Sequence, residues 1–177
     1  MMVLARHEAT GFGYAGALSP IHVTPVRSDS ELAAVKALFT EYQADVGCDV
    51  CFEGFSAEVA SLPGPYAPPS GRLLLAFAGE VAAGCVALRD LEDGRCEMKR
   101  LYVRPAYRGM KIGEALVAAV VAEAEGLGYR EMLLDTLPSM RRAQALYERL
   151  GFRDAPPNRT LPVAGARYMA FDLARRR

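Results

Sequence analysis

Apolar residues dominate three successive segments in the middle of the chain, with polar residues interleaved among them. Residues 72–78, 81–89 and 95–103 carry this strand-like pattern, and turns at Gly79-Glu80 and Asp93-Gly94 separate them. Short glycine-bearing turns between β-rich segments are typical of hairpins. The pattern therefore predicts three strands that form an antiparallel meander.

Helical spacing of apolar residues predicts elements on both sides of this meander. After a short strand at residues 21–26, Ser28 and Glu31 have capping-box spacing, and the apolar positions that follow predict one amphipathic helix. Residues 56–62 can form a short helix before a proline-rich stretch. Residues 112–125 are apolar nearly all round, which predicts a largely buried helix.

A strand, a helix and two further strands are expected in the last third of the chain. Residues 132–135 are a short buried strand, which should lie parallel to the strand ending at Val103 because a helix connects the two. Thr136 or Ser139 can cap the helix that follows. The remaining strands are expected at Phe152 and at residues 166–173.

The third strand of the meander changes phase near its middle. Glu97 and Lys99 are polar and alternate with apolar neighbours. Leu101 and Val103 occupy the next polar positions of this alternation, but both are apolar. A β-bulge between Lys99 and Leu101 makes such a change and turns backbone groups out of the ladder. A strand end buried on both faces would give the same pattern.

A glycine-bearing turn joins this strand to the long apolar helix. Gly109 and Gly113 lack a Cβ, so the backbone can turn sharply and a ligand can come close. Arg108 and Lys111 add positive charge where the helix begins, and the first turn of a helix offers N–H groups that hold phosphate oxygens. The turn is a candidate phosphate site, with an ordinary strand-to-helix turn as the alternative.

The turn resembles the R/Q-x-x-G-x-G/A signature of the GNAT superfamily of acetyl-CoA-dependent N-acetyltransferases, and reads Arg108-Gly109-Met110-Lys111-Ile112-Gly113 here. Residues 143–152 look like the family's A-x-x-L-Y-x-x-x-G-F segment at the expected distance downstream. Two linked motifs are more specific than one. Lys111 stands where the family usually has a glycine, and Met140 stands where an asparagine commonly precedes the second segment.

The resemblance covers about residues 21–173 and implies an α/β (mixed α+β) architecture, the GNAT-like acyl-CoA N-acyltransferase fold. In that fold a central, mostly antiparallel sheet contains a splayed parallel pair and carries helices on both faces. The pantetheine arm of acetyl-CoA enters the gap between the splayed strands, here those ending near Val103 and Asp135. Backbone donors along a separated strand can bind a pantetheine amide much as they bind an added strand.

The resemblance also implies the contacts of acetyl-CoA, the expected co-substrate. They lie at the end of the meander, in the glycine turn and before the last helix. The residues are Leu101, Tyr102, Val103, Arg108, Gly109, Met110, Lys111, Ile112, Gly113 and Ser139. No metal is expected.

Acetyl transfer to an amine requires a neutral nitrogen, whereas an alkylamine with a pKa near ~10.4 is almost wholly protonated at pH 7. Glu97, on the strand that faces the gap, is the candidate base, directly or through one water. The alternative is a surface carboxylate paired with Lys99 or Arg100. Asp135, at the end of the neighbouring strand, is the reserve candidate.

Two further groups are expected to handle the charge that develops during transfer. Backbone N–H groups at the bulge can stabilise an oxyanion, and the resemblance favours Val103 for this role. Tyr147 matches the family's usual proton donor to the leaving thiolate, with a core tyrosine as the alternative. Since a phenol at pKa ~10 is a weaker acid than a thiol at ~8.5, full transfer costs about 2 kcal/mol, and we expect Tyr147 to act partly as a hydrogen-bond donor.

Composition restricts the class of protein. With 177 residues and 51% hydrophobic content, the chain fits one soluble domain, expected over residues 21–177 after a flexible arm at residues 1–20. The 21 Lys and Arg residues equal the 21 Asp and Glu residues, so no basic field favours nucleic acid or a membrane surface as a partner. No apolar run approaches a membrane span and the start is a poor secretory signal, so a cytoplasmic location is expected. Monomer and homodimer both remain open.

The four cysteines are sparse and, without an export signal, are expected to be reduced thiols. Cys48 and Cys51 form a C-x-x-C pair, but no second pair has matching spacing. Plain thiols are therefore favoured over a zinc or redox site. Cys85 and Cys96 are interpreted as core residues.

The expected reaction is direct attack of a primary amine on acetyl-CoA in a ternary complex. The acceptor is open between a small molecule and a protein amino group: Asp45, Asp49 and Glu53 would suit a cationic amine, and Arg159 or Arg167 a carboxylate-bearing one. The alternative is a catalytically degenerate domain, marked by Lys111 and Met140, that binds CoA or an amine as a sensor.

Overall fold

One mixed sheet carries the helices of the computed structural model, which describes residues 20–47, 54–157 and 163–174. The strands are β1 (Ile21–Pro25), β2 (Arg72–Ala78), β3 (Val81–Asp90), β4 (Arg95–Val103), β5 (Glu131–Thr136), β6 (Arg153–Asp154) and β7 (Arg167–Asp172). The helices are α1 (Asp29–Val46), α2 (Phe55–Ser61), α3 (Ile112–Gly126) and α4 (Arg141–Leu150), with short 3-10 turns η2 (Gly64–Tyr66) and η3 (Pro105–Tyr107). The predicted arm, except Pro20, and the Cys48-x-x-Cys51 pair lie outside the described residues.

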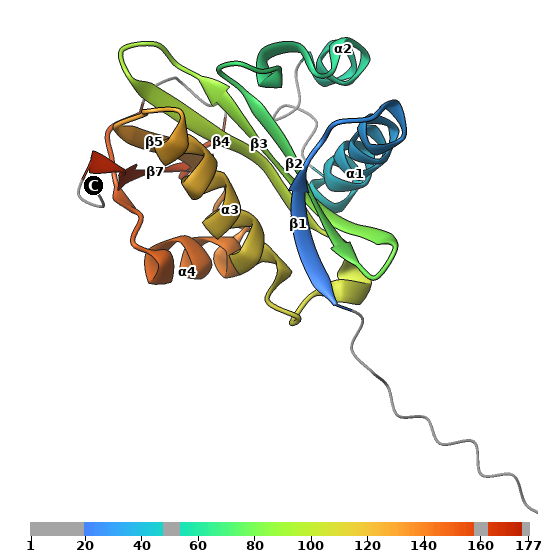
Figure 1. The fold of residues 1–177 in the computed structure, drawn as a ribbon. Helices are drawn as coiled ribbons and strands as arrows, with labels where there is room; N and C mark the ends of the chain where they lie inside the picture. The colour runs from blue at the N-terminus through green and yellow to red at the C-terminus, as the bar shows by residue number, and fades with distance from the viewer. Residues whose placement is uncertain (1–19, 48–53, 158–162, 175–177) are drawn as a thin grey trace, which may run out of the picture.

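The strands of the described chain follow the order β1-β2-β3-β4-β5-β7-β6. β2, β3 and β4 are antiparallel neighbours, which confirms the predicted meander. β4 and β5 run parallel and are connected through α3, as the crossover rule predicted. Figure 1 shows α3 and α4 on one face of the sheet and α1 with α2 on the other, the arrangement that the resemblance implied.

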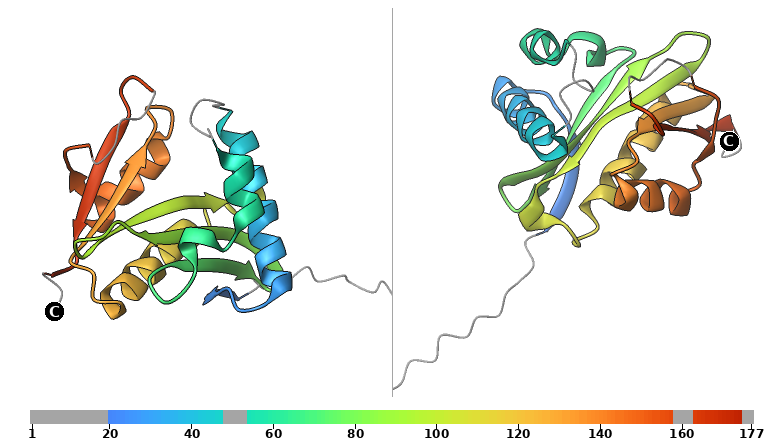
Figure 2. Two further views of the ribbon diagram at one scale, coloured as in Figure 1. Left: turned by 90° about the horizontal axis from the view of Figure 1, so that it is seen from above. Right: turned by 180° about the vertical axis from the view of Figure 1, so that it is seen from behind.

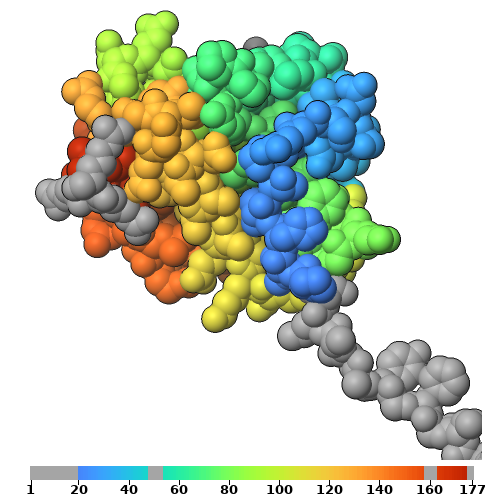
Figure 3. Space-filling model, in the orientation of Figure 1, coloured from blue at the N-terminus to red at the C-terminus, as the bar shows by residue number. Residues whose placement is uncertain are grey.

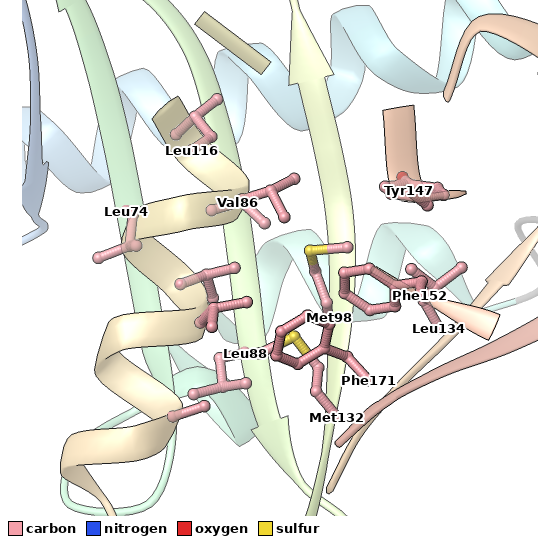
Figure 4. Close-up of a cluster of buried hydrophobic side chains, with 14 of the residues drawn as sticks. Leu74, Val86, Leu88, Met98, Leu116, Met132, Leu134, Tyr147, Phe152 and Phe171 are labelled. Atoms are coloured by element: carbon pink, nitrogen blue, oxygen red, sulfur yellow. The ribbon is translucent and has the colours of Figure 1, made fainter. Parts of the chain in front are cut away.

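Each face of the sheet has its own apolar core. On one face, Leu116 of α3 packs with strand residues such as Met98 and with Phe152 after α4 (Figure 4). On the other face, Phe39 of α1 packs with Leu75 of β2. In the space-filling view, α3 crosses the middle of its face between β1 and the C-terminal third of the chain (Figure 3). Helices packed on both faces therefore hold the sheet and fix the positions of its residues.

The two predicted helix caps have different outcomes. Ser28 accepts a hydrogen bond from the Glu31 N–H, and the Glu31 carboxylate accepts from the Ser28 N–H, so the capping box at α1 is confirmed. The cap predicted for α4 is wrong, because its N-cap is Met140, which makes no side-chain cap hydrogen bond. The Thr136 hydroxyl instead lies 3.7 Å from the Met140 sulfur. Pro138 and Ser139 form a turn, in which the Met140 N–H donates to the Leu137 carbonyl oxygen at 3.0 Å.

β4 contains the predicted β-bulge. The register shifts between Cys85 and Ala87 of β3, where β4 holds one extra residue, and Arg100 takes a left-handed backbone with a φ of 56°. Met98 and Leu101 consequently both pack on the α3 face, although they lie three positions apart. The phase change in the sequence therefore comes from a bulge.

β4 and β5 part after only three paired positions. Their register runs from Arg95 opposite Glu131 to Glu97 opposite Leu133, although both strands continue beyond it. Seen from above, β5 and β7 stand steeply away from β2, β3 and β4 (Figure 2). The splayed parallel pair that the resemblance implied is thus present, and it leaves a V-shaped opening between the two strands.

Candidate active site

A cleft of about 920 Å³ occupies the opening between β4 and β5. One wall is β4 from Met98 to Val103 together with the turn that leads into α3. The opposite wall is the end of β5 and the first turns of α4, and α1 contributes Tyr42, Asp45 and Val46. We call this space the cleft. Its size falls in the range of small-molecule and cofactor sites.

Helix α3 begins at the cleft without a side-chain cap. Its N-cap residue, Lys111, makes no side-chain cap hydrogen bond, and both Lys111 and Gly113 line the cleft. The first-turn N–H groups of a helix have no partner within the helix, and they lie at the positive end of its dipole. The start of α3 therefore has the properties of an anion-binding site.

Lysine at position 111 keeps the geometry that glycine would give. Lys111 takes the left-handed conformation with φ 61° and ψ 13°, two residues after Gly109 at φ 87°. Glycine adopts such angles without the steric cost that a Cβ brings. The departure from the family pattern at Lys111 therefore preserves the turn, at the expense of backbone strain.

The cleft is cationic although the whole chain has no net charge. Seven cationic side chains line it against three acidic ones, and carboxylates outside the lining, Glu58 and Glu97, pair with two of the cations, Arg100 and Lys99. The cations are Lys99, Arg100, Arg108, Lys111, Arg141, Arg142 and Arg149, and the acids are Asp45, Glu114 and Asp135. A concave site in which cations outnumber acids attracts a polyanion.

Arg108 is tied to three parts of the cleft wall. It donates to the Val103 carbonyl oxygen at 3.0 Å and to Asp45 of α1 at 2.5 Å, and its guanidinium lies 5.9 Å from the centre of the Tyr102 ring. Both charged side chains of the Arg108–Asp45 pair are about 40% exposed, so water screens their attraction. Asp45, predicted as an acceptor-binding acid, thus lies in the cleft but faces Arg108.

Arg100 connects the bulge of β4 to α2. Its Nε donates to Glu58 at 3.0 Å, and its guanidinium lies 5.1 Å from the centre of the Phe55 ring. The Tyr66 hydroxyl donates to the same carboxylate at 2.6 Å. Burial alone would raise the pKa of Glu58, but the hydrogen bonds and charge of Arg100 outweigh it and lower the pKa of Glu58 below its ordinary value. The pair therefore stays ionised and fixes one end of the cleft wall.

Tyr147 lines the cleft from α4 and packs against Phe152, with ring centres 5.7 Å apart. Burial is the main cause that raises the pKa of Tyr147, and the nearby Tyr42 and Asp135 add to the shift. The same cause raises the pKa of Tyr42 to about 12. Both phenols are therefore protonated around neutral pH and can donate hydrogen bonds. The position of Tyr147 combines the predicted site with the alternative core packing (Figure 4).

Glu97 lies on β4 before the bulge and is not among the residues that line the cleft. Its side chain is 1% exposed, so the alternative of a surface carboxylate is wrong. Arg89 donates to its carboxylate at 2.6 Å, and the Lys99 ammonium lies 3.7 Å away. The partner Lys99 was correctly anticipated, while Arg100 binds Glu58 instead.

Asp135 lines the cleft at the end of β5 and pairs with Lys99 of β4. The Lys99 Nζ lies 3.4 Å from the Asp135 Oδ1, and the two side chains are 10% and 17% exposed. This pair joins the two strands just beyond the point where they part. The reserve carboxylate, unlike Glu97, therefore lies where it can reach a molecule in the cleft.

Most of the predicted contacts of acetyl-CoA come together in the cleft. Those that line it are Leu101, Tyr102, Val103, Arg108, Gly109, Lys111, Ile112, Gly113 and Ser139. Met110 is not among the lining residues; it packs against the apolar core below the turn. Of the proposed acceptor residues, Arg167 pairs with Asp154 and Glu148, and Asp49, Glu53 and Arg159 lie outside the described residues.

Several residues of the cleft were not expected from the sequence. Tyr42 comes from a helix that is remote in the chain and reaches the cleft only because α1 packs on the sheet. Three arginines of the cleft lie on α4: Arg141, Arg142 and Arg149. Arg149 follows the other two by eight and seven positions, about two helical turns, and this spacing was the signal in the sequence that they share a face. Arg149 also donates to Glu114 of α3 at 3.0 Å.

Two other classes of site receive no support from the described part of the chain. It holds no group of three or more His, Cys, Asp or Glu side chains that could bind a metal ion. None of its helices has the length and apolar content required to cross a bilayer.

Comparison with known proteins decides the family. Residues 35–152 match the Acetyltransferase (GNAT) family, which is about two thirds of the chain. This chain belongs to the GNAT acetyltransferases. The predicted family and fold class are thereby confirmed.

Some of the proteins similar to this GNAT acetyltransferase match it over most of its length. An uncharacterized N-acetyltransferase of Schizosaccharomyces pombe is 37% identical over 159 residues, which are 89% of this chain and 98% of the relative. A Streptococcus agalactiae acetyltransferase structure shares the fold, with a TM-score of 0.72, 19% identity, and coverage of 86% of this chain and 98% of that one. A Salmonella typhimurium structure that contains its cofactor acetyl-CoA has a TM-score of 0.64, 18% identity, and coverage of 86% and 94%.

GNAT acetyltransferases use acetyl-CoA, and the cleft has the features that this molecule requires. The uncapped start of α3 and the surplus of positive charge suit its phosphates. The parted strands leave β4 without a β5 partner beyond Glu97, where an extended amide-bearing arm can pair with the backbone. The residues present therefore fit acetyl-CoA.

Proposed function

We propose that this GNAT acetyltransferase transfers the acetyl group of acetyl-CoA to the primary amine of an acceptor, by direct attack in a ternary complex. The parting of β4 and β5 beside the start of α3 carries the proposal, because it places a site for an extended arm and a site for an anion in one cleft. The remaining features of the cleft supply the proton-handling groups.

Different parts of the cleft would hold different parts of acetyl-CoA. The turn from Arg108 to Gly113 would bind the diphosphate through N–H groups and the positive end of α3. Arg141 and Arg142, exposed at the start of α4, add positive charge to the same cleft. β4 between the bulge and Val103 would hydrogen-bond the pantetheine amides. Bound acetyl-CoA supplies a thioester: as the acetyl group moves, a C–N bond forms, the C–S bond breaks, the nitrogen loses one proton and the sulfur gains one.

In this proposal Asp135 orients the amine and accepts the proton that the nitrogen loses. It lies in the cleft on the strand opposite β4, whereas the Glu97 carboxylate is buried beside Arg89 and outside the lining. Glu97 can act on the amine only through Lys99 or a water, so we propose that it positions Lys99. A carboxylate with a pKa near ~4 is a weak base toward an alkylammonium at ~10.4, so an ammonium bound at Asp135 would first lose a proton to solvent, and Asp135 would accept the second proton as the C–N bond forms.

Tyr147 would donate a hydrogen bond to the sulfur that leaves. Its raised pKa makes proton transfer to a thiolate more costly than the ~2 kcal/mol expected for an ordinary phenol, so we assign it hydrogen-bond donation without full transfer. Val103 lines the cleft, and its N–H group remains the proposed donor to the carbonyl oxygen.

Release of free thiol from acetyl-CoA, measured with a panel of primary amines and with mass detection of the product, tests the proposal. Asp135→Asn should lower kcat at least tenfold while acetyl-CoA binding is retained. Glu97→Gln should have the smaller effect of the two. If acetyl-CoA binds tightly and no amine is acetylated, the protein is a sensor and the proposed function fails.

A further inference from the structure

The Lys99–Asp135 ion pair has the arrangement that complements a zwitterion. We infer that the acceptor is a free α-amino acid, or an analogue with a carboxylate beside its amine, and that these two side chains recognise it. The inference deepens the proposed function, on which it rests for the reaction, by naming the class of acceptor.

The pair lies at the narrow end of the opening between the strands. Lys99 and Asp135 each follow by two positions the last paired residues, Glu97 and Leu133. Their neighbours Met98 and Leu134 pack in the core on the α3 face. Since successive residues of a strand point to opposite faces, Lys99 and Asp135 are on the face that α1 and α2 cover. The pantetheine arm of acetyl-CoA, entering along β4 from the start of α3, would bring its thioester toward this pair. The acceptor must therefore bind near Lys99 and Asp135.

A zwitterion suits this site because it can replace the contact between Lys99 and Asp135 with one new ion pair for each side chain. The ammonium of an α-amino acid can donate to Asp135 while its carboxylate accepts from Lys99, so each protein charge keeps an opposite charge beside it. Both side chains are largely buried, at 10% and 17% exposed, and buried charges are costly when they lose their counter-charge. An amine without a carboxylate would take Asp135 from Lys99 and leave Arg89 and Lys99 to share Glu97, so positive charge would be in excess at this buried end.

The other charges at this end disfavour acceptors with several amines. Arg100 lines the cleft one residue after Lys99, and its guanidinium is held by Glu58. A second ammonium on the acceptor would meet the Arg100 guanidinium, and the adjacent carboxylate of Glu58 already accepts from Arg100 and Tyr66. Polyamines are disfavoured, and a peptide N-terminus lacks the neighbouring carboxylate that Lys99 would bind.

Equilibrium binding tests the inference independently of turnover. Glycine, L-leucine, L-phenylalanine and L-glutamine are each titrated by calorimetry into the full chain, and each is compared with its own primary amide. Loss of one charge-assisted hydrogen bond corresponds to roughly tenfold or more in affinity. At least one amino acid should bind, and should bind at least tenfold more tightly than its amide.

Lys99→Met and Lys36→Met separate recognition from general effects of removing a lysine. Lys36 lies on α1 and is not among the residues lining the cleft, which makes it a matched control. Lys99→Met should weaken amino-acid binding at least tenfold and leave amide binding within about twofold, whereas Lys36→Met should change neither. If the Lys99–Asp135 pair only holds the two strands together, Lys99→Met should instead lower the thermal stability. It should then weaken the binding of amino acid and amide equally.

Each outcome decides between the two claims. Amides bound or acetylated as well as amino acids, or an acid-to-amide ratio that Lys99→Met leaves unchanged, would overturn the inference and leave the proposed function standing. Absence of amino-acid binding would also overturn it. Selective amino-acid binding without acetyl transfer would support the inference and contradict the proposed function.

Discussion

Gly84 of β3 lies directly against Tyr102 of β4. A Cβ at position 84 would come within 2.5 Å of the Tyr102 carbonyl oxygen and within 3.3 Å of the Val103 Cα. Because both contacts are backbone atoms beside the cleft, the two strands must shift to admit any side chain. Close packing at this glycine thus helps to fix the position of the β4 wall.

Gly84→Ala should lower the free energy of unfolding by about 1–3 kcal/mol, the usual cost of overpacking. Gly126→Ala is the matched control, since no atom lies within 4 Å of a Cβ there and the residue ends α3. It should be neutral or raise stability by about 0.5–1 kcal/mol. Urea denaturation of the two variants measures both effects, and equal stabilities would contradict the packing argument.

Lys111→Gly should relieve the left-handed strain at the start of α3. Since glycine gives up more chain entropy on folding, the net change in unfolding free energy should lie between zero and about 1 kcal/mol in favour of the variant. Lys111→Val should lower stability by about 1–2 kcal/mol, because a β-branched residue fits this conformation poorly. Thermal unfolding of both variants checks the order, and a valine variant as stable as the glycine variant would refute it.

The Glu58–Arg100 pair should make stability depend on pH. The pKa of Glu58 is lower in the folded protein than its ordinary value of 4.5, so the stabilisation is fully present above that value. It is lost as the pH falls through the lowered pKa. Between pH 5 and pH 3, the wild type should therefore lose more unfolding free energy than Glu58→Gln, as measured by chemical denaturation at each pH. Parallel pH profiles for the two proteins would contradict this role.

Tyr147→Phe should reduce thiol release about 10–100-fold and leave acetyl-CoA binding within about twofold, because it removes a donor needed only as the sulfur leaves. Tyr129→Phe is the control: Tyr129 is similarly buried and donates to the Ser70 carbonyl oxygen at 2.9 Å, but does not line the cleft. It should cost about 1 kcal/mol of stability with no loss of kcat. Equal kcat values for Tyr147→Phe and the wild type would remove Tyr147 from the mechanism.

The strand and helix order was predictable because local patterns determine it. The meander, the capping box at Ser28 and the parallel strand after α3 all follow from alternation, spacing and connection rules. The bulge at Arg100 was predictable because one inserted residue moves every later side chain of the strand to the opposite face of the sheet. The alternation of polar and apolar residues shows this change. The cap of α4 was missed because a polar side chain near a helix start is common, and only the local backbone decides which residue occupies the cap.

The site was predictable only where a motif marks it. Apart from Met110, the turn from Arg108 to Gly113 lines the cleft as expected, and so does Tyr147. The burial of Glu97 and the pairing of Lys99 with Asp135 could not be read from the chain, because they depend on how far β4 and β5 stay paired. Tyr42 was missed for a similar reason, since tertiary packing alone brings α1 to the cleft.

The central claim is that the start of α3 binds the diphosphate of acetyl-CoA. A Cβ at position 113 would make only ordinary contacts with Leu146 and Val103, so Gly113→Asp and Gly113→Asn should both fold. The dipole of α3 should favour the acidic variant. Calorimetric titration with acetyl-CoA should give a Kd at least tenfold weaker for the aspartate variant than for its neutral asparagine counterpart, about 1.4 kcal/mol. Equal Kd values for the two variants would contradict the account.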